Sequence, residues 1–221
     1  MSYKDLTVII PTLNEGRNIG KMLTLLEQYA GLSVLVCDDG SSDNTKEVVQ
    51  AFKFARFLDR TRAVEHGLTA SVLDGLTNCK TPYAVIMDGD LQHPPEAIPE
   101  FQRKLKSAQV VVGTRVRVAT AWPWYRRLIS KTATVLAKIV LAMRGTGVAD
   151  PMSGFFGIQT RLMNSIDRSR CVGKGYKVLL DILKQVRCDV QAVPYTFGAR
   201  DAGASKLRLK HWIWFVKSLL T

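Results

Sequence analysis

Two kinds of hydrophobic spacing alternate along the first half of the chain. Runs of consecutive apolar residues predict buried strands, and stretches with an apolar residue every three or four positions predict amphipathic helices. Strands are expected over 6–10, 32–37, 55–58 and 81–87, and helices over 17–29, over a segment ending near 52, and over 67–76. Because continuous apolar strands alternating with helices are typical of parallel sheets covered on both faces, the pattern predicts a doubly wound α/β fold.

The second half continues with fewer elements. A strand is expected over 110–113, a helix over 124–143, a helix over 175–186 and a last strand over 190–197. No apolar run reaches the roughly 20 residues of a membrane-spanning helix. We therefore predict one domain over 1–205 and an amphipathic tail over 206–221. The tail contains Trp212, Trp214 and several lysines, which suits an interfacial helix or the start of a membrane anchor.

Polar clusters follow three of the predicted strands, over 11–15, 38–41 and 88–90. The carboxyl ends of parallel strands meet at one edge of a sheet, where α/β proteins bind ligands. The chain has no G-x-G-x-x-G after its first strand and no Walker lysine loop, so dinucleotide and P-loop sites are disfavoured. A cluster of carboxylates instead suits hydrogen bonds to a ribose and base, with a metal for a diphosphate.

The third cluster contains two carboxylates separated by one glycine. On an extended segment Asp88 and Asp90 point to the same side, so both can face one hard cation, and Gln92 can add a neutral oxygen. Mg²⁺ or Mn²⁺ held by so few protein oxygens keeps positions for substrate phosphates. The alternative is an Asp-Gly turn followed by a helix cap, because two aspartates at this spacing are common by chance.

The second cluster also has a structural alternative. Asp38, Asp39 and Asp43 could form a turn and cap the following helix. We favour this interpretation for Asp43, whereas Asp39 has no evident structural duty in the sequence.

The charge of the chain is unusual. Thirty-one Lys and Arg against 19 Asp and Glu give a formal net charge of +12, which indicates a polyanionic partner: nucleic acid, anionic lipid or a phosphorylated substrate. The four cysteines lie far apart, with no pair at metal-ligand spacing, and no signal peptide is evident. We read them as reduced cytosolic thiols.

The basic residues concentrate in the middle of the chain, where 101–149 contain ten Lys or Arg and no Asp or Glu. Within the helix predicted over 124–143, Arg127, Lys131, Thr134 and Lys138 share one polar stripe. A basic amphipathic helix that begins near tryptophans suits an anionic bilayer surface. The alternative is a core helix with a solvated stripe. Nucleic acid is disfavoured because no recognisable nucleic-acid module is present.

The clusters over 11–15, 37–43, 62–75 and 88–96 together resemble the glycosyltransferases of family two. The run Asp-Gly-Asp-Leu-Gln-His-Pro-Pro narrows the resemblance to the dolichol-phosphate mannose synthases, and 150–155 and 200–206 are similar to further motifs of that group. The resemblance implies a GT-A fold, a doubly wound mixed sheet, with amphipathic interface helices over 115–145. His66 and Phe156 stand where relatives often have a basic residue, so the contacts of those basic residues do not transfer.

The resemblance also implies roles for individual residues. The nucleotide-sugar pocket would be lined by Pro11, Leu13, Asn14, Glu15, Asp38, Asp39, Asp88, Gly89, Asp90, Arg200 and Lys206. The metal, Mg²⁺ or Mn²⁺, would be bound by Asp88, Asp90 and Gln92, and the acceptor phosphate by Arg115, Arg117, Arg127 and Ser130. Asp90, Arg127 and Arg200 would be the catalytic residues.

The implied activity is an inverting transfer of mannose from GDP-mannose to dolichyl or another polyprenyl phosphate at the cytoplasmic face of a membrane. Small membrane-anchoring partner subunits fit this reading, and nucleic acid does not. Two alternatives stay open: a hexosyltransferase that uses a UDP-sugar on the same lipid, and a noncatalytic nucleotide-binding subunit that docks on a membrane.

Overall fold

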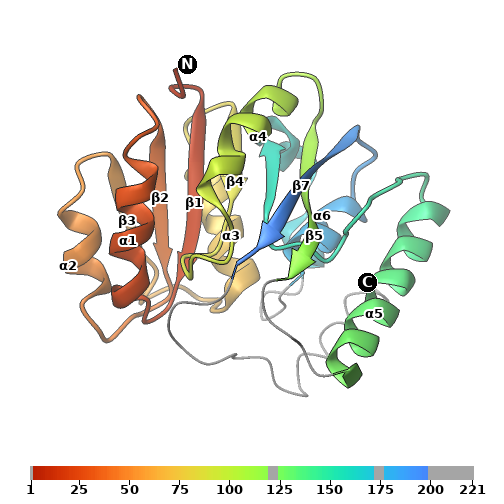
Figure 1. The fold of residues 1–221 in the computed structure, drawn as a ribbon, viewed down its shortest axis with the longest axis horizontal. Helices are drawn as coiled ribbons and strands as arrows, with labels where there is room; N and C mark the ends of the chain where they lie inside the picture. Colours follow the sequence, from red (N-terminus) through yellow and green to blue (C-terminus); the bar gives the residue numbers. More distant parts are fainter. Residues whose placement is uncertain (1, 119–123, 172–176, 199–221) are drawn as a thin grey trace.

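The protein forms a seven-stranded sheet covered by helices in a computed structural model (Figure 1). The structure describes residues 2–118, 124–171 and 177–198, without the side chains of 117, 118 and 124–131. The strands are β1 (Leu6–Thr12), β2 (Ser33–Asp38), β3 (Ala55–Asp59), β4 (Tyr83–Ile86), β5 (Val110–Val118), β6 (Phe156–Gln159) and β7 (Val190–Phe197). The helices are α1 (Gly16–Leu26), α2 (Thr45–Gln50), α3 (Leu68–Thr77), α4 (Ile98–Leu105), α5 (Trp124–Met143) and α6 (Val178–Leu183).

The sheet has the strand order β3-β2-β1-β4-β6-β5-β7. Strands β1 to β4 are parallel to one another, β6 is antiparallel to both β4 and β5, and β5 and β7 are parallel. The apolar runs predicted a parallel sheet and the family resemblance a mixed one. The mixed sheet is confirmed, and β6 is the strand that makes it mixed.

Each face of the sheet has its own hydrophobic core. Helices α1, α2 and α4 pack on one face, and α3, α6 and the inner side of α5 on the other (Figure 1). Along β1, Val8 and Ile10 point into the first core and Ile9 into the second. Burial on both faces explains why the strand is a continuous apolar run. On the second face α3 lies close to the sheet, since a Cβ at Gly75 would meet the Ile9 side chain at 2.6 Å.

The predicted bounds of α5 and β7 agree with the structure, and those of most other elements differ by a few residues. Strand β1 was expected to stop before Pro11 but continues to Thr12. Pairing with β4 ends at Ile9, so Pro11 pairs only with β2 and its missing N–H costs little there. Strand β6 and helix α4 were not predicted, because β6 has only four residues and prolines surround the start of α4.

Candidate functional site

The polar ends of β1 and β2 lie side by side, as expected for parallel strands. The Asp39 N–H donates to the Thr12 carbonyl at 3.0 Å. Asn14, at a φ of 56°, donates its N–H to Ser41 Oγ at 2.7 Å and accepts the Ser42 N–H on Oδ1 at 2.8 Å. These bonds join the loop after β1 to the loop after β2.

The remaining residues of the β1 loop differ in exposure. Glu15 donates its N–H to Thr45 Oγ1 at 3.1 Å, and its carboxylate accepts from Asn18 at 3.0 Å. Pro11 is half-buried and Leu13 is exposed. All four predicted residues, Pro11 in β1 and the three in the loop, therefore lie at the edge of the sheet formed by the carboxyl ends of β1, β2 and β4, here called the rim, and Glu15 also has a local structural partner.

Asp38 holds the turn after β2. Its buried carboxylate accepts the N–H groups of Gly40 and Ser41, at 3.2 and 2.8 Å, and the hydroxyls of Thr12 and Ser41, at 3.1 and 2.5 Å. Four donors satisfy a carboxylate, so Asp38 is committed to the turn.

Asp43 was predicted to cap the helix after β2, but the N-cap of α2 is Asn44, and Asp43 holds the start of that helix from one residue earlier. Its carboxylate accepts the N–H and hydroxyl of Thr45 at the start of α2, at 3.1 and 2.5 Å. It also accepts the Gly16 N–H at the start of α1, at 3.0 Å. Asp43 therefore ties together the first turns of two helices.

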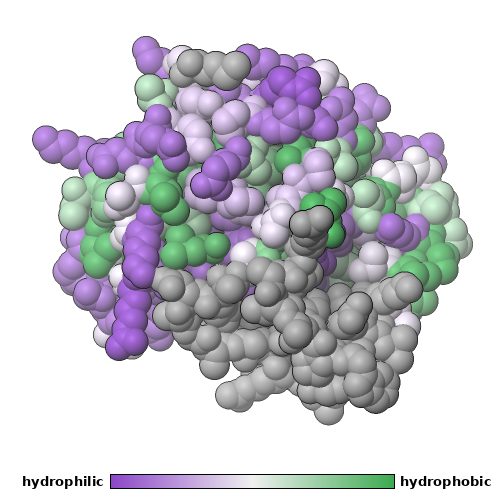
Figure 2. Space-filling model, viewed as in Figure 1, coloured by the Kyte–Doolittle hydropathy of each residue, from purple (hydrophilic) through white to green (hydrophobic). Residues whose placement is uncertain are grey.

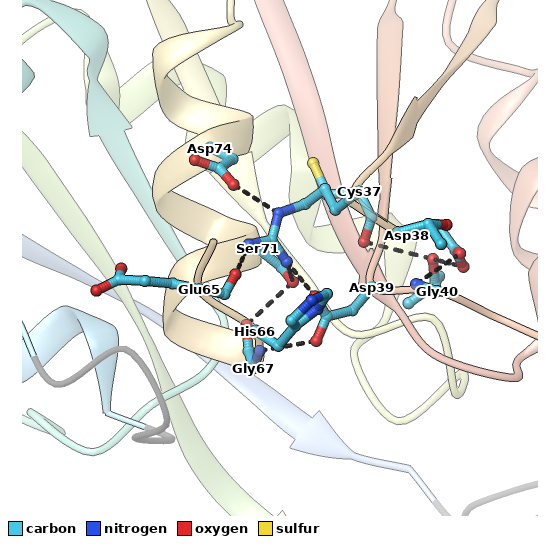
Figure 3. Close-up of polar contacts among 12 residues, drawn as sticks. Cys37, Asp38, Asp39, Gly40, Glu65, His66, Gly67, Ser71 and Asp74 are labelled. Carbon is cyan, nitrogen blue, oxygen red and sulfur yellow. Dashed lines mark hydrogen bonds and ion pairs between the residues drawn. The ribbon is translucent and has the colours of Figure 1, made fainter. Parts of the chain in front are cut away.

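The expectation that Asp39 has no structural duty is wrong. One carboxylate oxygen accepts from the Arg60 guanidinium and contacts His66 Nδ1 at 2.9 Å, and the other accepts the Gly67 N–H at 2.7 Å (Figure 3). Gly67 precedes α3, so the carboxylate lies at a helix N-terminus, where negative charge is favoured. Asp39 is thus held in one orientation at the rim.

Arg60 is the buried partner of Asp39, and it was not predicted from the sequence. Its side chain is 2% exposed and also donates to Asp74 Oδ2, Ser71 Oγ and the Glu65 carbonyl, each at 2.6 Å (Figure 3). Asp74 accepts a second cation, Arg168, at 2.6 Å. These acceptors are spread from 39 to 74 in the sequence, and no local spacing pattern connects them.

The third cluster follows β4 at the same rim. Asp90 is buried and accepts the Gln92 N–H on Oδ1 at 3.1 Å, whereas the Asp88 side chain is 40% exposed. Gln92 forms two hydrogen bonds with Gly198, which follows β7. Its side-chain Nε2 donates to the Gly198 carbonyl at 3.1 Å, and its backbone carbonyl accepts the Gly198 N–H at 3.0 Å. These contacts link the turn that carries the carboxylate pair to the end of β7, the edge strand of the sheet.

The buried side chain of His93 stabilises the turn that contains Asp88 and Asp90. Its Nδ1 accepts the Asp88 N–H at 2.9 Å, and its ring stacks on Phe155 with centroids 4.9 Å apart. Burial lowers the pKa of His93 to about 4, against the opposing effect of Asp90. The ring is therefore neutral near pH 7, and because Nδ1 accepts, the proton is on Nε2.

The loop before β6 completes this end of the rim. A Cβ at Gly154 would lie 3.7 Å from Asp88 Oδ2, so the loop passes close to the carboxylate. Arg115 donates through Nε and Nη2 to Asp150 Oδ2, at 3.2 and 2.9 Å, and Lys177 donates to the Met152 carbonyl at 3.1 Å. Lys177 was not singled out from the sequence, where it is one lysine among many.

Several predicted residues lie outside what the structure describes. These are the side chains of Arg117, Arg127 and Ser130, and all of Arg200 and Lys206. Their assigned roles stay predictions from the resemblance.

The described residues contain no group of three or more His, Cys, Asp or Glu side chains that could hold a metal ion. The predicted set of Asp88, Asp90 and Gln92 has two carboxylates and an amide. Carboxylate oxygens at an open rim fit a hard divalent cation that takes its other ligands from substrate and water.

Helix α5 presents a second surface, at the side of the sheet. Ala133, Ala137 and Leu141 are buried, while several large apolar side chains are exposed: Val135 and Leu136 by 49% and 47%, Ile139 by 51% and Met143 by 83%. Figure 2 shows apolar surface along the edge where α5 lies in Figure 1. The helix therefore packs through two alanines and Leu141, and it turns four larger apolar residues outward. Within the described part of the chain, none of the helices has the length and apolar character needed to cross a bilayer.

Comparison with known proteins agrees with this geometry. Residues 7–166 match the family model described as glycosyl transferase family 2. The chain belongs to glycosyl transferase family 2. This family 2 chain is 35% identical to the dolichol-phosphate mannosyltransferase of Saccharomyces cerevisiae, with 97% of the chain and 85% of that protein covered. It is 34% identical to the protein of the same name from Pyrococcus furiosus, with 92% of the chain and 59% of that protein covered.

Solved structures show the fold. The family 2 chain superposes on glucosyl-3-phosphoglycerate synthase of Mycobacterium tuberculosis with a TM-score of 0.70 at 20% identity, covering 97% of this chain and 77% of the other. A structure of the same synthase with Mn²⁺, UDP and glucosyl-3-phosphoglycerate gives a TM-score of 0.68. The architecture of this enzyme is that of the GT-A glycosyltransferases.

Proposed function

We propose that this enzyme transfers mannose from GDP-mannose to dolichyl or another polyprenyl phosphate. The observation that carries the proposal is the similarity, at 33–35% identity over 92–99% of the chain, to three proteins named dolichol-phosphate mannosyltransferase from two fungi and an archaeon. A match of that length includes both ends of the rim. The described geometry supports it, because polar loops suited to a nucleotide lie on the same rim as the carboxylate pair and a group of cations.

The donor nucleotide would bind at the Asp39 end of the rim. The loops after β1 and β2 are tied together by Asn14 and Asp38, which makes a preorganised surface for the nucleoside. Asp88 and Asp90 would hold Mg²⁺ or Mn²⁺, which as a Lewis acid offsets charge on the leaving diphosphate. A divalent ion is supported by the Mn²⁺ named with the glucosyl-3-phosphoglycerate synthase, a protein of the same fold.

The acceptor phosphate is its own nucleophile. The second pKa of a phosphate monoester is about 6, so the group is largely dianionic at pH 7. One of its oxygens forms a bond to the anomeric carbon while the bond from that carbon to the diphosphate oxygen breaks, and GDP leaves with the electron pair. A direct displacement inverts the anomeric centre and needs no strong general base. It does need cations that bring two anions together, the role proposed for Arg115, Arg117, Arg127, Arg200 and Lys206.

The exposed apolar side of α5 would lie on the membrane that contains the lipid acceptor. Leu136 and Ile139 supply apolar surface, and the exposed Lys138 between them supplies positive charge. This combination suits the interface of an anionic bilayer. We place the enzyme at the cytoplasmic face, where small membrane-anchoring subunits would be compatible partners.

The proposal is tested by offering radiolabelled nucleotide-sugars with dolichyl phosphate and Mn²⁺ and then extracting the lipid phase. Label from GDP-mannose is expected in the lipid, and EDTA is expected to prevent the transfer. Transfer from a UDP-sugar alone would replace the proposed donor. Nucleotide binding with no transfer from any donor would indicate a noncatalytic subunit.

A further inference from the structure

Lys177, the residue directly before α6, donates to the loop that passes close to Asp88, and it has no part in the motifs recognised from the sequence. We propose that its ammonium group binds a phosphate group of the reacting substrates, a role that rests on the proposed lipid-phosphate mannosyl transfer. The phosphate is either that of the lipid acceptor or that of the donor diphosphate, and the geometry favours the acceptor.

The first observation is how few acceptors Lys177 has. Among the described residues, the one hydrogen bond of its ammonium group is the 3.1 Å contact from Nζ to the Met152 carbonyl. An ammonium group carries three donors. A single carbonyl leaves most of its hydrogen-bonding capacity for a ligand.

The second observation is the loop to which Lys177 is bound. Met152 lies between Asp150, which pairs with Arg115, and Gly154, where a Cβ would lie 3.7 Å from the Asp88 carboxylate. Lys177 is therefore held against the loop that lines the carboxylate pair. This places it on the same side of the rim as Arg115, away from the Asp39 end where the nucleoside would bind.

The third observation is the charge around the group. Burial and the nearby Arg115 lower the pKa of Lys177 to about 8, although Asp150 and Asp88 oppose both effects. Asp150 already accepts both donors of the Arg115 fork, so it does not require Lys177 as well. The described hydrogen-bond partner of the ammonium is a neutral carbonyl, and a bound phosphate would supply an anion in direct contact with it.

A purely structural role explains these facts poorly. A carbonyl such as that of Met152 is satisfied by any neutral donor, whereas an ammonium that loses part of its hydration, as the half-buried Lys177 does, is costly unless it is paired with an anion. A cation at this position is useful when a phosphate arrives, and it offsets the repulsion between two phosphate groups at one site.

The test compares Lys177→Gln, which keeps a donor for the Met152 carbonyl and removes the charge, with Lys177→Arg, which keeps the charge. Citronellyl phosphate serves as a soluble acceptor and GDP-mannose as the donor. The glutamine variant is expected to raise the KM for the acceptor at least about tenfold, the loss typical of one charge-assisted hydrogen bond. The arginine variant is expected to recover most of it, with Tm unchanged in both.

Lys104→Gln is the matched control, because Lys104 also donates to a backbone carbonyl, that of Ala192, at 2.6 Å, but pairs with Glu100 on α4. A rise in the KM for GDP-mannose alone would assign Lys177 to the donor phosphate. Wild-type values of kcat and of both KM values in Lys177→Gln would overturn the inference. So would a loss of activity that follows a loss of Tm and is not recovered by arginine.

Direct binding separates this inference from the proposed function. If the wild-type chain transfers mannose from no donor, the mannosyltransferase proposal fails, and Lys177 is judged by calorimetry with citronellyl phosphate. Tighter binding to wild type than to Lys177→Gln supports the phosphate role. Equal binding overturns it.

Discussion

The two ends of the rim, at Asp39 and at Asp88, differ in how their charges are neutralised. At the Asp39 end the carboxylate accepts from Arg60 and Gly67 and contacts His66, and the main cation is 2% exposed and satisfied by protein acceptors. At the Asp88 end the carboxylate is 40% exposed, and the nearby Lys177 donates to a single described carbonyl. The Asp39 end is ordered before a ligand binds, whereas the charges at the Asp88 end are balanced when its ligands bind. A nucleoside needs a rigid hydrogen-bonding surface, whereas a reacting phosphate needs charge that is not already neutralised.

The largest effect is expected at the Asp88 end. Asp90→Asn keeps the shape of a buried side chain but removes its negative charge, so turnover with Mn²⁺ is expected to fall at least about a thousandfold, on the order of the loss of a main electrostatic contribution. Steady-state kinetics over a Mn²⁺ titration, together with Tm, measures this. Asp189→Asn, at an exposed carboxylate away from the rim, is the control. A wild-type rate in metal-containing buffer would remove the metal role.

The next effect concerns the rigid end. Arg60→Met leaves Asp39 and Asp74 without their shared cation, so the free energy of unfolding is expected to fall by about 3 kcal/mol, as for other broken buried pairs. GDP binding is expected to weaken with it, because Asp39 loses its orientation. Denaturant unfolding and calorimetry with GDP give the two values.

Arg168→Met is the matched control for Arg60, since it removes the other, more exposed cation on Asp74 and leaves Asp39 untouched. Similar losses in the two variants would show that Asp39 gains nothing special from Arg60. The comparison between a preformed and a ligand-dependent end would then fail.

A smaller effect is expected on the outer surface of α5. Leu136→Asp combined with Ile139→Asp places charge on apolar surface that is about half exposed, so binding to anionic phospholipid vesicles is expected to weaken about tenfold or more. Activity on citronellyl phosphate in solution is expected to stay unchanged. Val64→Asp, at a fully exposed apolar residue elsewhere, is the control in vesicle sedimentation. Unchanged sedimentation of the double variant would contradict a membrane role for this face.

The smallest effect is a pH dependence at the rigid end. Burial raises the pKa of Asp43, but hydrogen bonds from Thr45 and Gly16 lower it more, so the folded-state pKa is below the usual value. A carboxyl with a lowered folded pKa stabilises the fold above its unfolded pKa, and this contribution is lost as the pH falls through the folded value. Asp43→Asn is therefore expected to flatten the acid side of the Tm-against-pH curve. A curve parallel to wild type would contradict the assignment.

The sequence predicted which types of residue lie at the rim better than it predicted which residues contact one another there. Three polar clusters at the ends of apolar strands indicated one shared edge, since that conclusion needs only the parallel sheet. The same pattern misjudged Asp39, whose partner Arg60 lies 21 positions away with nothing local to mark it as buried. Lys177 and the Asp150 loop meet for the same reason: antiparallel β6 and the start of α6 bring together residues with no regular spacing.

Helix α5 shows the same division. Its length could be read from the period of its residues, because a helix repeats every 3.6 residues whatever surrounds it. The periodicity could not decide which apolar residues face the core. Packing selected the small side chains of Ala133 and Ala137 for the inner side and left Leu136 and Ile139 outside.

By itself the sequence determined most of the elements, though not β6 or α4, the parallel pairing of the first strands, and the carboxylate pair at the end of a buried strand, since local spacing and turn chemistry are properties of neighbouring residues. Only the tertiary structure decided that protein groups neutralise the Asp39 carboxylate, whereas the proposed partner of the Lys177 ammonium is a ligand. Charge neutralisation depends on groups that are close in space and distant in sequence, and burial sets its strength.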